Sequence, residues 1–206
     1  MVFEHVENNK KAPNKQELSP ALFLGYKPFN KIDLNLRAFA KRVFRMPTFN
    51  DLYYAQVGYS DLKPEYMNQV DFGFTYSVPF KRSILDRFSI QADAYYTETT
   101  DKIIAAPTGN LFRWMMSNIG KVKGYGVETS ADVDYHFGPV VMNTHLSYAY
   151  TSQRDYTLIG GHKLSSYGDQ IPYTPWHSGS TIVAAQYKDW HLNYSFIYVG
   201  MRYNGA

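Results

Sequence analysis

The sequence predicts an all-β protein, an antiparallel up-and-down meander of about eight strands that forms part of a larger transmembrane β-barrel. Three observations predict this fold. Apolar and polar residues alternate along several segments, which gives strands with one apolar and one polar face. Aromatic residues make up 17% of the chain, although the mean hydropathy is polar at −0.39. Short and long connections also alternate, as they do in barrels of the bacterial outer membrane.

The composition excludes several classes of protein. The net charge of +3 is too small, and its charges too scattered, to indicate a nucleic-acid-binding face, so no nucleic-acid partner is expected. The absence of cysteine excludes disulfide frameworks and Cys-ligated metal sites. No apolar run approaches the ~18 residues that a transmembrane helix needs, which excludes a helical membrane protein.

The predicted strands follow an N-terminal loop. Residues 1–16 are polar and are expected to form this loop, and residues 17–203 to hold about eight strands. The clearest strand is 69–80, where apolar residues occupy the even positions and polar residues or glycine the odd positions from Gln69 to Ser77. The predicted strands are 18–27, 31–38, 69–80, 87–97, 123–135, 140–151, 177–187 and 190–196.

The connections between these strands fall into two groups that alternate along the chain. Because antiparallel strands reverse direction at each connection, all short turns then share one end of the sheet and all long loops the other. The short connections are 27–30, 79–86, 136–139 and 187–189, and the long ones are 45–67, 98–120 and 152–176.

The alternation also assigns residues to the lipid face or to the lumen face of a barrel. Asp71 and Glu128 are expected to face the lumen, because a charge on the lipid face is costly. Gly124 and Gly126 fall on the same side, where they would leave room for an enclosed domain. Aromatic residues at strand ends would form the interfacial girdle: Phe44, Phe80, Tyr96, Tyr125, Tyr135, Tyr148, Tyr150 and Trp190.

Several short motifs occur in one order along the chain. A strand ends in Arg45-Met46-Pro47-Thr48, a loop carries Leu52-Tyr53-Tyr54, and the next strand begins with Leu62-Lys63-Pro64-Glu65. Four further motifs follow along the chain: Asn118-Ile119-Gly120, Gly124-Tyr125-Gly126-Val127-Glu128, Ile171-Pro172-Tyr173-Thr174-Pro175-Trp176-His177 and Val199-Gly200-Met201-Arg202-Tyr203. Together these motifs resemble the barrel of TonB-dependent outer-membrane receptors, with the motif positions Arg45, Pro47, Leu62, Pro64, Glu65, Gly126 and Glu128.

The resemblance implies a function and a set of partners. A receptor of this family lies in the outer membrane and takes up a scarce nutrient such as an iron-siderophore, haem or cobalamin by TonB-driven transport. The implied partners are membrane lipid, a plug domain, TonB and a small-molecule or metal-chelate ligand, without a cofactor. Residues 1–206 would form part of the barrel, with the plug and the final strands outside this sequence. No enzyme is expected, because catalytic motifs and metal-ligand spacings are not found.

The external loops would hold the ligand, because aromatic residues and arginine are the usual anchors of binding sites. The candidate ligand-binding residues are Tyr53, Tyr54, Arg113, Trp114, Tyr156 and Tyr167.

Two alternatives belong to other classes of protein. A complete eight-stranded outer-membrane barrel with a structural or adhesion role fits the strand number. A soluble β-sandwich binding module fits the exposed aromatic residues, but it gives no reason for sorting the loops by end.

Overall fold

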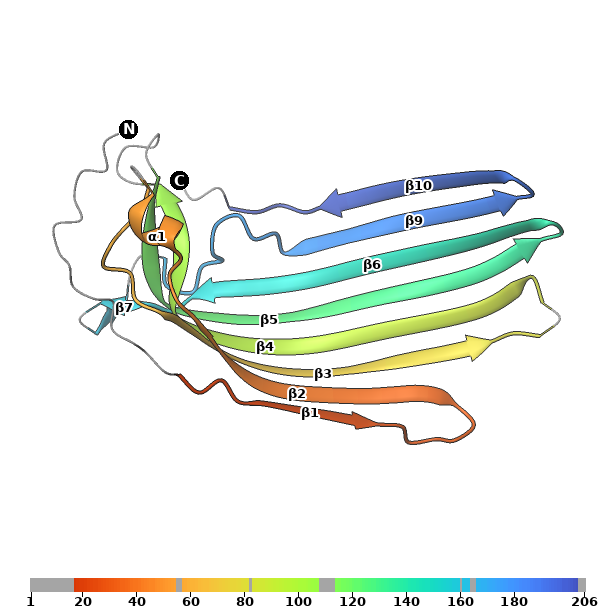
Figure 1. The fold of residues 1–206 in the computed structure, drawn as a ribbon, viewed down its shortest axis with the longest axis horizontal. Coiled ribbons are helices and arrows are strands. Elements are labelled where there is room, and N and C mark those ends of the chain that lie inside the picture. Colours follow the sequence, from red (N-terminus) through yellow and green to blue (C-terminus); the bar gives the residue numbers. More distant parts are fainter. Residues whose placement is uncertain are drawn as a thin grey trace.

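The computed structural model describes residues 17–54, 57–81, 83–107, 114–159, 161–163 and 166–203. One antiparallel sheet of eight strands, in the order β1-β2-β3-β4-β5-β6-β9-β10, dominates it (Figure 1). Its strands are β1 (Ala21–Tyr26), β2 (Asp33–Arg45), β3 (Glu65–Pro79), β4 (Leu85–Pro107), β5 (Trp114–Phe137), β6 (Val140–Asp155), β9 (His177–Tyr187) and β10 (Trp190–Val199). A small hairpin of β7 (Leu158–Ile159) and β8 (His162–Lys163) and the short helix α1 (Phe49–Tyr53) lie in the connections.

This arrangement confirms the predicted meander, because each strand of the large sheet pairs with its neighbour in chain order. The tight turns lie at one end of the sheet, and α1 and β7 lie at the other (Figure 1). We call these the turn end and the loop end. The two ends therefore differ as the connection lengths predicted.

The predicted long connection 98–120 is wrong in its extent. β4 continues to Pro107 and β5 begins at Trp114, so these strands are 23 and 24 residues long. Their outer parts pair in unshifted register from Thr97 and Gly124 to Pro107 and Trp114, with only the Asp101/Gly120 pair missing from the ladder. The alternation of apolar and polar residues is lost there, because outward side chains beyond an apolar band can be charged. The backbone hydrogen bonds between the strands continue, because they do not depend on side-chain polarity.

The pairing register gives the sheet two chemically different faces. One cross-strand row consists of Leu34, Tyr76, Ile90, Ala131, Leu146, Thr181 and Phe196. A row on the opposite face consists of Arg37, Gly73, Asp93, Glu128, Ala149, Ser178 and Val199. We call these the apolar face and the polar face.

Aromatic side chains bound the apolar face at both ends. Tyr125 lies next to Tyr150, with ring centroids 6.2 Å apart, at the loop end. Tyr135 and Phe137 make an edge contact at 5.7 Å at the turn end. The ten residue-to-residue steps from Tyr125 to Tyr135 span about 25 Å along the barrel axis at a strand tilt of about 40°. This is the height of the apolar band of a membrane barrel.

The apolar face has no second layer over it. Phe72 is 57% exposed and Leu192 is 70% exposed. Among the described residues, the buried apolar side chains are Leu62, Ile103, Val122 and Ile171, and all of them belong to the loop end. The core of the chain therefore holds the loops together, while the sheet leaves its apolar side uncovered.

These features disfavour both alternatives. A β-sandwich packs two sheets face to face, and the described residues form only one large sheet. A complete eight-stranded barrel would pair its first and last strands, but within the described residues β1 pairs only with β2 and β10 only with β9. The sheet is thus an open segment of a barrel wall.

Candidate functional site

The polar face carries a bidentate ion pair between two strands that are not neighbours. Arg37 of β2 donates from Nε to Oδ1 of Asp93 of β4 at 2.8 Å and from Nη2 to Oδ2 of the same carboxylate. Its Nη1 donates to Oγ1 of Thr75 at 2.7 Å. Gly73 of β3 lies between these strands, and a side chain there would collide with the Asp93 carboxylate. Glycine therefore lets the ion pair bridge over β3.

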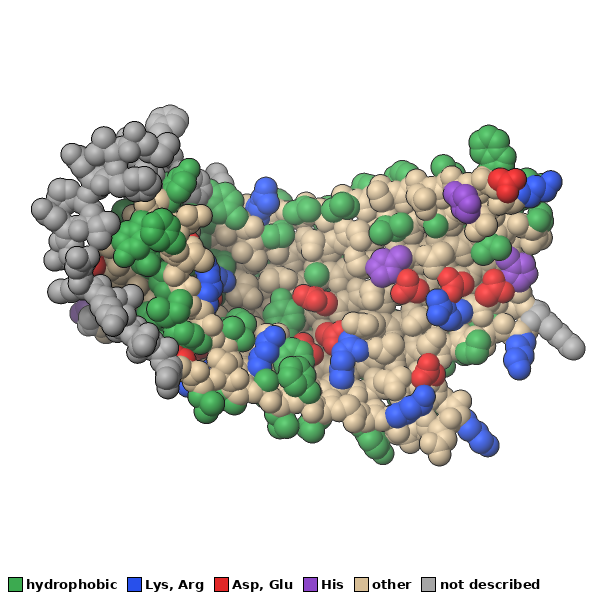
Figure 2. Space-filling model, in the orientation of Figure 1, with side chains coloured by type: hydrophobic (Ala, Val, Ile, Leu, Met, Phe, Trp, Pro, Cys, Tyr) green, Lys and Arg blue, Asp and Glu red, His purple; other side chains and the backbone are tan. Residues whose placement is uncertain are grey.

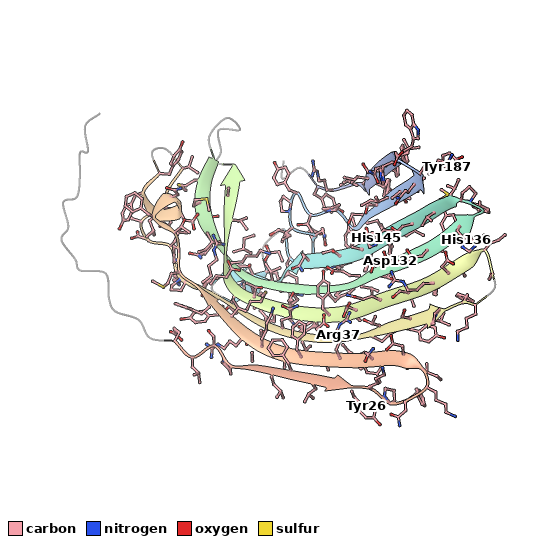
Figure 3. The ribbon with its side chains drawn as sticks, turned by 45° about the vertical axis from the view of Figure 1, so that its right-hand side comes forward. Tyr26, Arg37, Asp132, His136, His145 and Tyr187 are labelled. Atoms are coloured by element: carbon pink, nitrogen blue, oxygen red, sulfur yellow. The ribbon has the colours of Figure 1, made fainter. Side chains whose placement is uncertain are left out.

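A second set of polar contacts lies closer to the turn end. The Nδ1 atom of His145 lies 2.8 Å from Asp132, and Arg87 donates from Nε to Asp134 at 2.7 Å. His136 lies 2.9 Å from Asp86. Figure 3 labels Arg37, Asp132, His136 and His145 along the sheet. Figure 2 shows basic, acidic and histidine side chains gathered on this face. The polar face is therefore suited to contact with water or with another polar surface.

A hollow of about 430 Å³ lies on the polar face. Its lining includes Asp93, Glu128, Ser130, Ser147 and Ser180. Glu128, a motif position, is the register partner of Asp93, so two carboxylates face this hollow side by side. The predicted inward direction of Glu128 agrees with this position.

Gly126 has a different role from the expected one. A Cβ atom at this position would lie 2.5 Å from the Tyr95 hydroxyl group and 2.6 Å from the backbone oxygen of Tyr150. The Tyr95 ring occupies the space over Gly126, where an enclosed domain was expected to approach the sheet. Gly124 is similar, because a Cβ atom there would meet Gln153 and Thr97. Both glycines make room for side chains of neighbouring strands.

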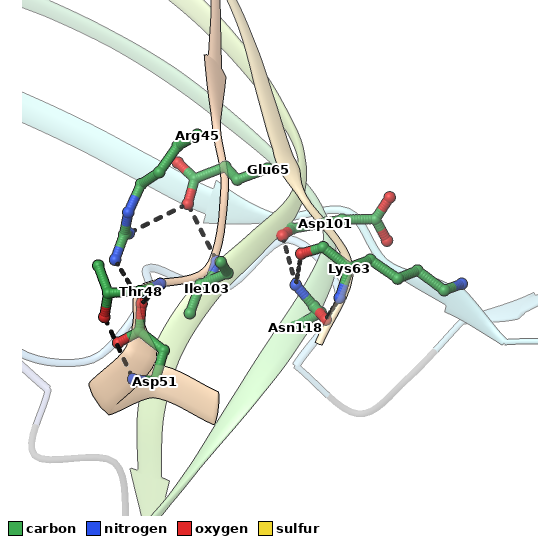
Figure 4. Close-up of polar contacts among 8 residues, drawn as sticks. All are labelled: Arg45, Thr48, Asp51, Lys63, Glu65, Asp101, Ile103 and Asn118. Carbon is green, nitrogen blue, oxygen red and sulfur yellow. Dashed lines mark hydrogen bonds and ion pairs between the residues drawn. The ribbon is translucent and has the colours of Figure 1, made fainter. Parts of the chain in front are cut away.

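At the loop end, the motif residues Arg45 and Glu65 hold α1 against the sheet (Figure 4). Arg45 donates to Asp51 at 3.1 Å and to Glu65 at 3.5 Å, and Glu65 accepts the backbone N–H of Ile103 at 3.1 Å. Thr48 and Asp51 form a capping box at the start of α1. These contacts join β2, α1, β3 and β4.

The electrostatics of this region follow from those contacts. Burial alone would raise the pKa of Asp51, but the hydrogen bonds from Thr48 and the nearby Arg45 outweigh it and hold the pKa below its ordinary value. Burial lowers the pKa of Lys102, which lies in β4 beyond the aromatic girdle, against the opposing effect of Glu65.

Asn118 lies in one of the motifs but is not among the candidate site residues, and its side chain makes three hydrogen bonds to the backbone of distant segments. Its Oδ1 accepts the backbone N–H of Lys63 at 2.8 Å, and its Nδ2 donates to the carbonyl groups of Lys63 at 3.1 Å and Asp101 at 2.7 Å. Asn118 thereby ties the segment before β3 to the β4–β5 hairpin. Pro64 immediately follows Lys63, and Leu62 before it is only 8% exposed.

The candidate ligand-binding residues occupy several places at the loop end. Tyr53 ends α1 and contacts Phe49 at 5.1 Å, and Tyr54 follows it. Tyr53 is 60% and Tyr54 62% exposed. Trp114 is the first residue of β5, and Arg113 lies outside the described residues.

Tyr156 and Tyr167 form an edge contact at 5.2 Å, so the structure brings these two candidates together.

The motif prolines lie where predicted, Pro47 after β2 and Pro64 before β3. Among the described residues, no group of three or more His, Asp or Glu side chains could hold a metal ion. In the same part of the chain, no helix is long and apolar enough to cross a membrane.

An open antiparallel sheet with an exposed apolar face between two aromatic rows, and a polar face opposite, defines a segment of β-barrel wall. The chain belongs to the TonB dependent receptor-like β-barrel family, whose model matches residues 3–206. Receptors of this family are outer-membrane proteins.

Two curated relatives are vitamin B12 transporters named BtuB. The protein of Vibrio vulnificus is 39% identical over 88 residues, which cover 43% of this chain and 13% of that protein. The protein of Photobacterium profundum is 27% identical over 181 residues, which cover 84% of this chain and 26% of that protein. The chain therefore spans about a quarter or less of the length of these relatives.

Solved structures show the same fold. The copper transporter OprC matches with a TM-score of 0.66 at 18% identity, over 90% of this chain and 27% of that chain. The FrpB iron transporter from Neisseria meningitidis (F3-3 variant) matches with a TM-score of 0.52 at 18% identity, over 89% of this chain and 27% of that chain.

Proposed function

We propose that this chain forms part of the wall of an outer-membrane transporter that takes up a scarce nutrient by TonB-driven transport. The observation that supports it most is the family match over residues 3–206, together with an apolar face that no part of the described chain covers. On this proposal, the apolar face contacts lipid and the polar face surrounds a plug domain. The protein would act as a receptor and transporter, not as an enzyme.

We propose cobalamin as the first ligand to test, because both curated relatives are vitamin B12 transporters. An iron-siderophore or haem is the alternative ligand class. Tyr53 and Tyr54 are the proposed anchors in the loops, because both are exposed beside the fixed helix α1, and a planar aromatic side chain binds large ligands with little loss of side-chain entropy. Arg113 and Trp114 are proposed as further contacts.

Growth on limiting cobalamin tests this proposal. The complete protein is expressed in a Gram-negative strain that lacks its own cobalamin transporter, and we expect growth to be restored. The double variant Tyr53→Ala/Tyr54→Ala should need about 30-fold more cobalamin, the loss that corresponds to the about 2 kcal/mol of a binding hot spot. Tyr187→Ala, at the turn end of β9, is the matched aromatic control and should grow like the parent.

Parallel cultures receive a ferric siderophore or haem as sole iron source. Growth on one of these without growth on cobalamin would overturn the cobalamin assignment and leave the transport function standing. Failure on all three, with the protein present in the outer membrane, would contradict the proposed function.

A further inference from the structure

The apolar face changes to a charged one within a single step of the strand ladder at the loop end. The last largely apolar row consists of Ala40, Val70, Tyr96, Tyr125 and Ser152. The next row on the same face consists of Arg42, Asn68, Glu98, Lys123 and Arg154. On the proposed function, this step is the edge of the hydrocarbon layer, so the second row lies at the depth of lipid headgroups.

Besides Arg42, which lies 5.2 Å from the centre of the Tyr66 ring, three cations near this edge lie over aromatic rings and are close to one another. The Lys123 ammonium group is 5.3 Å from the centre of the Tyr156 ring, and the Lys163 ammonium group is 4.5 Å from that of Tyr167. Tyr156 and Tyr167 contact each other at 5.2 Å, which joins both lysines into one group. We call Lys123, Arg154 and Lys163, with their aromatic partners, the edge cluster.

Arg154 belongs to the edge cluster through the sheet. It is the register partner of Lys123, and its guanidinium carbon lies 5.3 Å from the centre of the Trp176 ring. Its Nη1 donates to the carbonyl group of Gly168 at 3.3 Å, which orients the guanidinium group. A guanidinium group held in this way is preorganised to bind a phosphate group.

The edge cluster carries excess positive charge. None of the ion pairs found among the described residues includes Lys123, Arg154 or Lys163. Glu98 is the register partner of Lys123 but pairs with Lys121 at 2.7 Å. The carboxylate of Asp155, beside Arg154, accepts hydrogen bonds from Thr157 and Ser166 instead.

We propose that the edge cluster is a binding site for the phosphate groups of a membrane lipid headgroup. This inference rests on the proposed function, since it needs the apolar face to contact lipid. The cations supply charge for phosphate oxygens, and the aromatic rings hold the cations at the height of the headgroups. Tyr156 and Tyr167 would then serve lipid contact and not the transported ligand.

Native mass spectrometry of the complete protein in detergent tests the inference. The protein is titrated separately with diphosphoryl lipid A, with dephosphorylated lipid A and with inorganic phosphate. We expect diphosphoryl lipid A to bind most tightly. The double variant Lys123→Gln/Arg154→Gln should weaken its binding by about 30-fold, the loss expected for two cations near a lipid surface.

Two controls make the loss specific. Lys188→Gln removes a lysine that also stacks on a tyrosine, Tyr187, at 5.3 Å, but at the turn end, and should leave binding unchanged. The exchange Lys123→Arg/Arg154→Lys keeps both charges and should keep most of the binding. If the double variant does not fold, Lys123→Gln and Lys163→Gln are compared singly, each with an expected loss of about fivefold.

The outcomes separate this inference from the proposed function. Equal binding of dephosphorylated lipid A, or undiminished binding by the cluster variants, would overturn the lipid site alone. Competition by inorganic phosphate at the same concentration as the lipid would overturn the lipid assignment in favour of free phosphate. Absence of the protein from outer-membrane fractions would overturn the proposed function itself.

Discussion

At the scale of single residues, adjacent positions on one strand meet different surroundings. Ala131 of β5 lies in an apolar row between Ile90 and Leu146, midway between the aromatic rows. Ser130 pairs with Gln91 and Ser147 on the polar face and lines the hollow there. The same substitution at these two positions therefore compares the apolar face with the polar face. Both positions lie on the same strand at nearly the same depth, and the two original side chains are similar in size.

We predict that Ala131→Arg destabilises the complete protein in lipid vesicles by about 2–4 kcal/mol, because it places a charge on the lipid face near the midplane. Ser130→Arg should change the free energy of unfolding little, because it points toward the lumen. Urea unfolding of both variants beside the parent measures the difference. Equal losses at the two positions would contradict the assignment of the faces.

At the scale of elements, α1 depends on contacts outside itself. Its five residues are too few for a stable isolated helix. The capping box and the Arg45 ion pairs fix its start, and Asn118 fixes the segment that returns from it to β3. The proposed anchors Tyr53 and Tyr54 are therefore positioned by residues on three different strands.

Asn118→Ala should loosen the segment before β3 without unfolding the sheet. It removes three hydrogen bonds to Lys63 and Asp101, each with a net contribution of about 1 kcal/mol. Hydrogen exchange at the Lys63 amide should accelerate by at least about tenfold. Asn193→Ala, in the exposed strand β10, is the matched control, and unchanged exchange at Lys63 in the Asn118 variant would refute this role.

The pKa of Asp51 predicts a pH dependence for the same region. Because its folded-state pKa lies below its ordinary value, the ionised carboxylate stabilises the start of α1. This contribution is complete at neutral pH and is lost as the pH falls through the folded-state pKa. Amide exchange in α1 should therefore accelerate in acid relative to the sheet, and Asp51→Asn should show fast exchange already at neutral pH.

At the scale of the whole molecule, the chain exposes what a soluble protein buries. Its apolar face is uncovered, and the outer edges of β1 and β10 have no strand beside them within the described residues. Uncovered strand edges and large apolar patches favour association.

We predict that the chain expressed alone aggregates in water and is dispersed only by detergent. Size-exclusion chromatography with light scattering, with and without detergent, measures this. A soluble monomer at high concentration would count against the membrane interpretation, because such a state would need the apolar face to be covered from within the chain.

The sequence by itself determined the strands, their two faces and the separation of turns from loops. Segment 69–80 shows why, since its alternation depends only on the geometry of one strand. The tertiary structure alone decided the Arg37–Asp93 pair, the space over Gly126, the contacts of Asn118 and the full length of β4 and β5. Each of these depends on the register between different strands, and periodicity within one strand carries no information about its partner's register.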